Sequence, residues 1–435
     1  MRRAPWASLA LTLAAMMGLI ILVGCGGGSS TTPITPTTPP PVANTVNVVV
    51  NSGPANNAVN FAYVSVQVCN PGSTTSCVTI PDVQVDTGSS GLRILASAPG
   101  VSGLDLAPVT GSGTPVYECL PFGADYLWGQ VEQADVYMAG EKAANLPIQV
   151  ISSSATPSNV PSTCTYGGGQ NLGSSTALQA NGILGVGTTL QDCGSACSTN
   201  PVSLFYYWLC SSSGCSLADV LTATQVSNPV GFFESDNNGV ILALGSVNAG
   251  GAASATGVLT FGIGTQSDNA FSSSANAYAL SLNSQDSYSI YAAYNVLAYP
   301  AFIDSSYIYN LFLDSAAVSA APAGAGISNC ALNSLFYCTS SAVNLPFTVA
   351  DGNGNTGSAS INIGNGTTLW NSSVENGGSN TAFDNLAEGT PLGGTVSVVL
   401  GLPFFYGNTV YVGIAGKPTP TGVPAADAGL GYWAF

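Results

Sequence analysis

The most informative stretch of the sequence is VQVDTGSSGL at residues 83–92. Its apolar, polar, apolar lead-in predicts a strand that ends at Asp86. A tight turn is expected next, because Gly88 lets the backbone fold closely over the aspartate side chain. The Gly88 N–H and the Ser89 hydroxyl can then donate to the carboxylate, and such donors favour its ionised form. The stretch therefore predicts a carboxylate held at the end of a strand by its own turn.

The composition excludes several classes of function. The 435 residues contain no histidine, which removes Ser-His-Asp and Cys-His catalysis and His-ligated zinc. The net charge is -16, and the only basic residues beyond the N-terminus are Arg93, Lys142 and Lys417. So few cations cannot neutralise phosphates, which argues against nucleic-acid binding. Acid–base chemistry falls to Asp, Glu, Tyr, Lys or Cys, and carboxylates are its natural candidates.

The N-terminal residues have the features of an export signal. Arg2 and Arg3 precede an apolar run at residues 9–23, and the run ends in LVGC, which resembles a bacterial lipobox. We expect residues 1–24 to be a signal peptide and Cys25 to be lipidated, which anchors the chain to a lipid bilayer. The alternative is an uncleaved transmembrane anchor, because the run is nearly long enough. The rest of residues 25–44 is a Gly, Ser, Thr and Pro linker, and Gly26 after Cys25 favours the outer membrane of the cell envelope by resemblance.

The remaining ten of the 11 cysteines form an even set, which in an exported chain predicts disulfides. Their spacing permits five pairs: Cys69 with Cys77, Cys119 with Cys164, Cys193 with Cys197, Cys210 with Cys215, and Cys330 with Cys338. Because these cysteines are scattered and no histidine accompanies them, we expect no metal site.

Strand signals dominate from Thr45 to the C-terminus. Short runs rich in Val, Ile, Tyr and Phe are bounded by Gly, Asn, Ser or Pro, which is typical of strands joined by tight turns. Residues 203–209 and 305–312 are candidate short helices. The pattern as a whole predicts an all-β fold, a large sandwich or barrel.

The stretch around Asp86 resembles the first active-site motif of pepsin-like aspartic peptidases, and the resemblance continues in that family's order. Residues 122–129 resemble the flap hairpin, with Phe122 where the family usually has Tyr. Residues 180–187, 239–246 and 398–405 resemble the segment beneath the first catalytic strand, the inter-lobe strand and the matching segment of the second lobe. The resemblance implies an all-β, two-lobed pepsin-like barrel fold with an inter-lobe cleft. The N-terminal lobe would be residues 45–255, with Asp86 and the flap, and the C-terminal lobe residues 256–435, with Asp304.

The expected second motif is PAFIDSSY at residues 300–307, and it departs from the family's pattern. Asp304 and Ser305 fit, but Ser306 replaces the expected Gly and Tyr307 replaces a small hydroxyl residue. A Cβ at position 306 would be strained if the turn needs an open backbone, and Tyr307 cannot repeat a short serine hydrogen bond. Asp314 is a poorer alternative, since no Gly follows it either. Asp304 is therefore either catalytic or a structural remnant.

The resemblance implies an envelope-anchored, monomeric aspartic endopeptidase that needs no metal or organic cofactor. Asp86 and Asp304 would share one proton and activate a water. Catalytic support would come from Thr87, Gly88, Ser89 and Ser305, and Phe122 and Gly123 on the flap would cover a polypeptide substrate. The alternative is a non-catalytic pepsin-fold surface lipoprotein that binds peptide, glycan or protein.

Arg93 follows the first motif, where the family often has an aromatic residue. It could pair with a carboxylate near the cleft or lie on the surface, and the surface position is the expectation.

Overall fold

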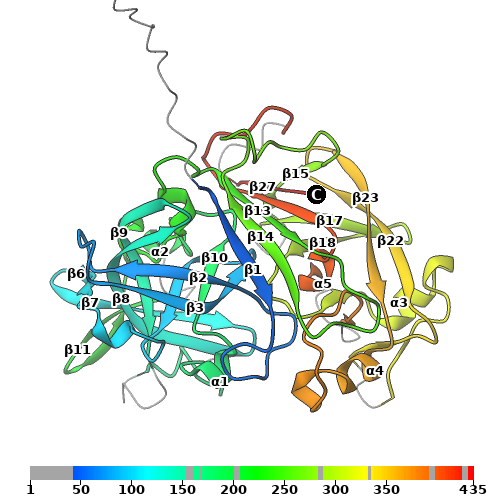
Figure 1. The fold of residues 1–435 in the computed structure, drawn as a ribbon, viewed down its shortest axis with the longest axis horizontal. Helices are drawn as coiled ribbons and strands as arrows, with labels where there is room; N and C mark the ends of the chain where they lie inside the picture. Colours follow the sequence, from blue (N-terminus) through cyan, green and yellow to red (C-terminus); the bar gives the residue numbers. More distant parts are fainter. Residues whose placement is uncertain are drawn as a thin grey trace, which may run out of the picture. The chain divides into compact units, whose positions relative to one another are not determined.

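The computed structural model describes residues 43–152, 160–165, 168–199, 206–282, 288–331, 335–390, 397–423 and 430–435. The expected signal peptide, Cys25 and nearly all of the linker lie outside these ranges. No helix within them is both long enough and apolar enough to cross a membrane. The described body is built almost entirely of strands (Figure 1).

Seventeen of the described strands form one sheet, which holds the N-terminal half and the last two strands of the chain. They are β1 (Thr45–Val50), β2 (Ala62–Cys69), β3 (Cys77–Asp86), β4 (Ser90–Leu95), β5 (Ala107–Pro108), β6 (Thr110–Gly111), β7 (Thr114–Phe122), β8 (Asp125–Met138), β9 (Glu141–Ile151), β10 (Gly182–Val186), β11 (Tyr207–Ser211), β12 (Gly214–Leu217), β13 (Gly239–Leu244), β14 (Ala255–Phe261), β15 (Ala277–Ala279), β26 (Thr409–Gly413) and β27 (Tyr432–Ala434).

A second sheet of eight described strands forms the other lobe. Its members are β16 (Ser281–Leu282), β17 (Tyr288–Tyr294), β18 (Leu297–Ile303), β19 (Asn310–Phe312), β22 (Val343–Ala350), β23 (Thr356–Ile363), β24 (Ala387–Gly389) and β25 (Val398–Leu400). The other described elements are a small pair, β20 (Ser328–Asn329) and β21 (Tyr337–Cys338), and short helices. Two of these helices, α1 (Ser175–Leu178) and α2 (Ala196–Thr199), come between strands of the first sheet, and α3 (Ser315–Ser319), α4 (Gly366–Asn371) and α5 (Leu402–Phe405) come later in the chain.

The same threading pattern occurs in both sheets. In the first, β10 pairs in parallel with β3, with Gly185 opposite Asp86, and antiparallel with β4. In the second, β25 pairs in parallel with β18, with Leu400 opposite Ile303, and antiparallel with β19. Each aspartate of the two expected motifs therefore stands at the end of a strand that is held in place by a strand from much later in the chain.

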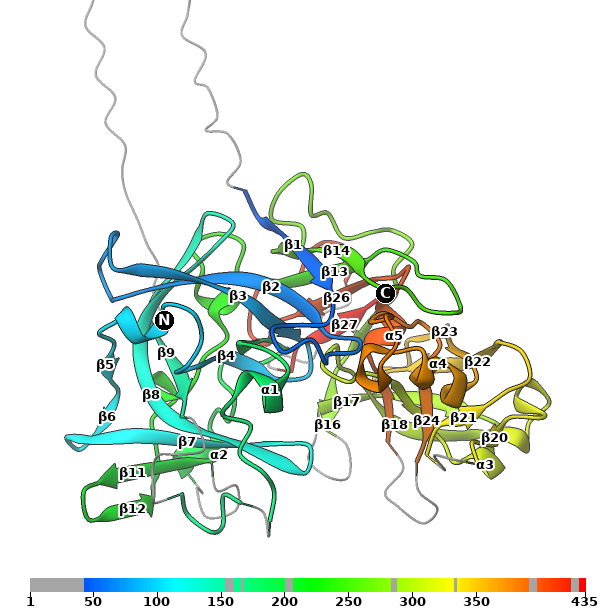
Figure 2. The same cartoon turned by 60° about the horizontal axis from the view of Figure 1, so that its bottom comes forward.

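Three strands lie between the two lobes and join them. β14 pairs with both β1 and β13, and β13 also pairs with β26. Figures 1 and 2 show β1, β13 and β14 between the blue and cyan strands of one lobe and the yellow and orange strands of the other. The all-β, two-lobed fold that the resemblance implied is confirmed. The expected lobe boundary between residues 255 and 256 falls at the start of β14 and stays a prediction.

The core explains why the apolar runs became strands. Val83 and Val85 before Asp86, and Leu184 on β10, have no exposed surface, and neither have Ile303 and Leu400 around the second aspartate. One connected cluster of buried side chains includes residues of both lobes. Each such side chain stabilises the fold by about 1.5–3 kcal/mol relative to its exposed state. The two aspartates thus stand on rigid, buried strand ends.

Five disulfides cross-link the described residues, and they are the five pairs that the spacing permitted: Cys69–Cys77, Cys119–Cys164, Cys193–Cys197, Cys210–Cys215 and Cys330–Cys338. Their sequence separations run from 4 to 45 residues, so each closes a local loop. Disulfides persist in oxidising compartments, so this set is typical of a protein that folds outside the cytoplasm.

The two expected helices are wrong where the structure describes them. Residues 305–309 form turns, and Asn310–Phe312 is strand β19 because it pairs with β24. Of residues 203–209, the first three lie outside the described ranges, and 207–209 belong to β11, which pairs with β7. Pairing with distant strands overrides the local helical pattern in both places.

Candidate active site

Asp86 is the last residue of β3, and its carboxylate is held by its own turn. Oδ1 accepts hydrogen bonds from the backbone N–H of Gly88 at 2.8 Å and of Ser89 at 3.1 Å. Oδ2 accepts the Ser89 hydroxyl at 2.5 Å. The residue is only 1% exposed. Both oxygens therefore have donors, as the sequence of the turn predicted.

Asp304 follows β18, and its backbone N–H donates to the Leu400 carbonyl at 3.0 Å. Its Oδ1 accepts both the backbone N–H of Ser306 at 2.8 Å and the Ser306 hydroxyl at 2.7 Å. The expected strain at position 306 is absent, because Ser306 is not among the described residues with positive φ. Tyr307 lies beside the aspartate, and the serine hydroxyl that it cannot supply comes from Ser306 instead.

The two turns are joined by a reciprocal pair of hydrogen bonds. The Thr87 N–H donates to the Ser305 hydroxyl at 3.1 Å, and the Ser305 N–H donates to the Thr87 hydroxyl at 2.9 Å. Each hydroxyl also donates into the opposite lobe, Thr87 to the Ile303 carbonyl at 3.1 Å and Ser305 to the Val85 carbonyl at 2.7 Å. Both side chains are buried. These four bonds fix the position of one aspartate relative to the other.

The carboxyl of Asp304 packs directly against the first turn. A Cβ placed on Gly88 would lie 2.3 Å from both Cγ and Oδ2 of Asp304, so only glycine fits there. Burial, and then the charge of Asp86, raise the pKa of Asp304 to about 8, while the Ser306 hydrogen bonds act in the opposite direction. The Asp86 and Asp304 carboxyls also interact through a side-chain hydrogen bond. Burial and the neighbouring charge of Asp86 thus both favour the protonated form of Asp304.

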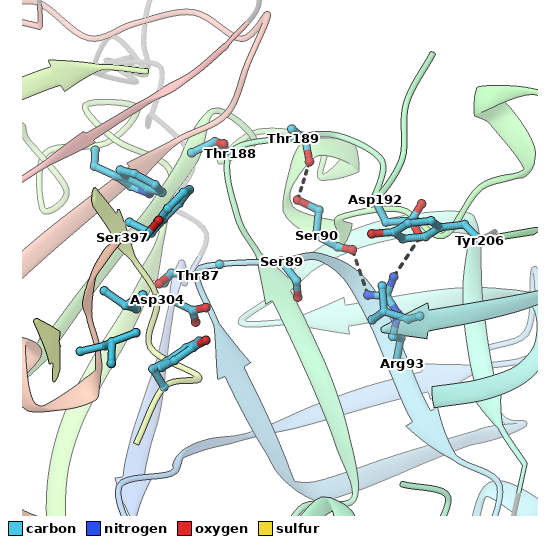
Figure 3. A pocket seen from close by; sticks show the side chains of 17 residues that line it. Thr87, Ser89, Ser90, Arg93, Thr188, Thr189, Asp192, Tyr206, Asp304 and Ser397 are labelled. Carbon is cyan, nitrogen blue, oxygen red and sulfur yellow. Dashed lines mark hydrogen bonds and ion pairs between the residues drawn. The ribbon is translucent and has the colours of Figure 1, made fainter. Parts of the chain in front are cut away.

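Asp304 and the turn that follows Asp86 border a cavity of ≈ 570 Å³ between the lobes. Its lining comes from both sheets: Thr87, Gly88, Ser89, Ser90, Arg93, Leu120, Thr188, Thr189, Asp192, Tyr206, Phe302, Asp304, Tyr307, Leu311, Ser397, Val399 and Trp433. In Figure 3, Asp304 and Thr87 lie toward one end and Arg93, Asp192 and Tyr206 toward the other, with Ser89 and Ser90 between them. The arrangement is a cleft lined by polar and apolar side chains, with Asp304 at one end.

The expectation that Arg93 lies on the surface is wrong, since the residue has no exposed surface. Its guanidinium binds Glu118 at 2.6 Å and Asp192 at 3.1 Å, and it donates to the Ser90 carbonyl at 3.0 Å. The Tyr207 hydroxyl donates to the second oxygen of Asp192 at 2.7 Å. Burial and the charge of Glu118 raise the pKa of Asp192 well above its ordinary value. This cluster of Arg93, Glu118, Asp192 and Tyr207 holds the wall of the cleft in place beside the first motif.

The expected flap is the hairpin of β7 and β8, in which Phe122 pairs with Asp125 and Gly123 lies at the tip with a φ of 63°. However, the hairpin residue that lines the cavity is Leu120, and Phe122 packs partly buried against the core. The sequence analysis missed Leu120, Asp192, Tyr206 and Trp433. Leu120 could have been found from the alternation of β7, because it points to the same side as Phe122, two residues later.

The side chains of the cleft are suited to proton transfer. Among the described residues, no group of three or more Cys, Asp or Glu side chains is placed to share a metal ion. Two carboxyls that share a proton offer one group to accept a proton and one to donate it.

The comparisons with known proteins give one family and no curated relative. A family of proteins described as of unknown function, DUF3443, matches residues 40–435. No curated protein matches the sequence. Among solved structures, an aspartic proteinase from Irpex lacteus is 15% identical, over 90% of this chain and 96% of that chain, with a TM-score of 0.49.

Proposed function

The chain belongs to the DUF3443 family of proteins of unknown function, and we propose that it is an aspartic endopeptidase that hydrolyses peptide bonds with Asp86 and Asp304. The observation that carries this proposal is the joined pair of turns. Four hydrogen bonds between Thr87 or Ser305 and the opposite lobe hold two carboxyls against each other at a cleft. Burying two carboxyls next to each other is costly to stability, and proteins keep such pairs chiefly where they are used.

The reaction follows from the unequal protonation of the pair. The ionised carboxylate takes a proton from a water molecule, whose oxygen attacks the scissile carbonyl carbon. The protonated carboxyl donates to the carbonyl oxygen, so that a neutral tetrahedral intermediate forms. The C–N bond then breaks as the leaving nitrogen gains the proton that came from the water, while the other carboxylate takes a proton from a hydroxyl of the intermediate. Acid and amine are released, and the pair again holds one proton. The raised pKa of Asp304 supports its role as the initial proton donor.

The substrate is proposed to be an extended polypeptide. The cavity combines hydroxyl side chains, such as Thr188, Thr189 and Ser397, with the apolar Leu120, Phe302 and Val399. Hydroxyls can bind the backbone amides of an extended strand, and apolar side chains of the substrate fit the remainder. Leu120 on the β7–β8 hairpin takes the covering position that was expected of Phe122 and Gly123, and excludes water when substrate is bound.

The location belongs to the same proposal. Removal of residues 1–24 and lipidation of Cys25 would anchor a monomeric chain to the envelope, at the outer membrane, with residues 25–44 as a tether. The lobes are taken as residues 45–255 and 256–435. Incorporation of radiolabelled palmitate into the wild type, and its loss in Cys25→Ala, tests the anchor independently of any activity.

Cleavage of a reduced, alkylated protein across pH 3 to 7 by the purified full chain tests the activity. Asp86→Asn and Asp304→Asn are each expected to reduce kcat by about a thousandfold or more. Asp105→Asn, an exposed aspartate outside the cavity, is the matched control and is expected to keep full activity. A folded wild type without cleavage, or cleavage that survives both dyad substitutions, refutes the proposal.

The alternative is a non-catalytic module that binds peptide, glycan or protein, and one observation favours it. Tyr307 is 37% exposed at the cavity, where the resembled family has a small hydroxyl residue that supports the aspartate. Such a module would bind a statine-containing peptide, or a glycan, with an affinity that Asp304→Asn leaves unchanged. An endopeptidase would lose affinity for the statine peptide in the same variant, because the statine hydroxyl binds between the two carboxyls.

A further inference from the structure

Ser306 stands two residues after Asp304, as Gly88 stands two residues after Asp86. Both supply a backbone N–H to Oδ1 of their aspartate, each at 2.8 Å. Ser306 adds its hydroxyl to the same oxygen at 2.7 Å. In the first motif, by contrast, the hydroxyl comes from Ser89 and reaches the other oxygen, Oδ2. The hydroxyl has thus moved by one residue along the chain and to the other carboxylate oxygen.

This rearrangement leaves Oδ2 of Asp304 without a hydrogen bond from any donor of the described residues other than the dyad itself. The oxygen lies over Gly88, at a place where a Cβ would come within 2.3 Å of it. The Asp304 carboxyl shares a hydrogen bond with Asp86, whose own oxygens are both held by Gly88 and Ser89. A carboxyl with two donors on one oxygen carries its proton on the other.

We propose that Ser306 is a positioning residue, whose hydroxyl and N–H hold Oδ1 of Asp304 and so direct the shared proton to Oδ2. This inference rests on the proposed function and names the residue that sets its pH range. In the first motif the same substitution is impossible, because a Cβ at Gly88 meets Asp304. In the second motif there is room for the side chain, and it supplies the hydroxyl that Tyr307 does not.

Few titratable groups face Asp304. Asp86 faces it from the end of β3, and Tyr307 is on its own turn, with a pKa raised by burial and by the Asp304 charge. Glu388 of β24 acts on Tyr307 rather than on Asp304. Arg93 and Asp192 line the same cavity, bound to each other. The effect of Ser306 on Asp304 can therefore be separated from these groups by changing one hydroxyl.

Ser306→Ala is the decisive variant, because it keeps the backbone N–H and removes only the hydroxyl. A hydrogen bond to a carboxylate favours the ionised form, so its loss raises the pKa of Asp304. We expect the alkaline limb of the kcat/KM profile to move up by about one pH unit. We also expect kcat to fall about tenfold because the proton is less well placed. KM should stay near the wild-type value. Ser306→Thr retains a hydroxyl, so its kcat and the alkaline limb of its kcat/KM profile should be close to those of the wild type.

Thermal unfolding gives a second readout that needs no activity. The wild type is expected to lose stability as the pH rises toward the pKa of Asp304, and in Ser306→Ala this loss should extend about one pH unit higher. Ser216→Ala, an exposed serine on β12, is the control and should change neither profile. Identical profiles for Ser306→Ala and the wild type overturn the proposal. A folded wild type that cleaves nothing refutes the proposed endopeptidase alone, and the unfolding profile then decides the role of Ser306.

Discussion

Asp86 and Asp304 end equivalent strands, but their carboxyl groups are held differently. Three donors from the first turn hold both oxygens of Asp86, and two donors from Ser306 hold a single oxygen of Asp304. The first motif is also followed by the buried cation Arg93, whereas the residue at the same distance after Asp304 is Leu311. The pair thus consists of one fully held carboxylate and one carboxyl that retains a proton, which is the asymmetry that general acid–base chemistry requires.

The largest expected effect is the pH dependence of stability. Asp304 has a pKa of about 8 in the folded protein against an ordinary value of 3.8, so the unfolded chain releases its proton first. The free energy of unfolding should therefore be highest below about pH 4 and fall as the pH rises to about 8. Glu132 and Glu388, whose pKa values burial raises to about 7, add to the same fall.

Asp304→Asn isolates the contribution of the dyad, since Asn resembles the protonated carboxyl. We expect this variant to have a flatter profile of thermal unfolding against pH and to be more stable than the wild type at pH 8, although inactive. Asp86→Asn should flatten the profile less, because it removes only the second cause of the raised Asp304 pKa. An unchanged profile in Asp304→Asn would contradict the asymmetry.

Arg93→Leu replaces Arg93 by leucine, the residue type that Leu311 supplies at the same distance after Asp304. We expect a loss of about 4 kcal/mol in the free energy of unfolding, because Glu118 and Asp192 are left buried without a cation. Urea unfolding followed by tryptophan fluorescence measures it. Lys142→Met breaks the half-exposed ion pair with Asp135 and should cost much less. Equal losses in the two variants would contradict the brace that we assign to Arg93.

Gly88→Ala adds a side chain to the first turn, and Ser306→Gly removes the side chain at the equivalent position of the second turn. The new Cβ at position 88 meets the Asp304 carboxyl, so Gly88→Ala should cost about 3 kcal/mol and nearly all activity. Ser306→Gly should cost about 1 kcal/mol, since it removes one hydrogen bond and adds backbone freedom. Urea unfolding and peptide cleavage compare them, and the opposite order of the two losses would show that the turns are interchangeable.

Thr87→Val and Ser305→Ala are expected to have smaller effects than Arg93→Leu and Gly88→Ala, and to be alike. Each removes one hydroxyl of the reciprocal pair and leaves a buried backbone group without its partner, at about 2 kcal/mol. The double variant should lose less than the sum of the two, because both hydroxyls fix the same junction between the two turns. Thr74→Val, an exposed threonine, is the control for urea unfolding. Clearly unequal losses would mean that one lobe dominates the junction.

What the sequence predicted correctly has local causes. The donors to Asp86 all lie within three residues of it, so the turn could be derived from the stretch itself. The disulfides join cysteines that are near in sequence, which made their spacing informative. The alternating apolar runs predicted strands because burial on one face has the same period as the strand.

What the sequence did not predict depends on distant residues. Arg93 is buried with Glu118 and Asp192, which lie 25 and 99 residues away in the sequence. No local sequence pattern indicates these contacts. Asn310–Phe312 became a strand through pairing with β24, which lies far along the chain. The expected strain at Ser306 assumed that this turn needs an open backbone, but neither Ser306 nor its counterpart Gly88 has a positive φ. Glycine is needed at position 88 because the distant Asp304 carboxyl leaves no room for a Cβ.

The return of β26 and β27 to the first sheet has a consequence for the timing of folding. These strands pair with β13 and β15, and Trp433 of β27 lines the cavity. A chain that emerges N-terminus first, from a ribosome or through a membrane channel, cannot close this sheet until β27 is free. The cleft is therefore incomplete throughout synthesis and passage. On the proposed function, the cutting site would form only after the chain has been released, which would spare that chain while it is still unfolded.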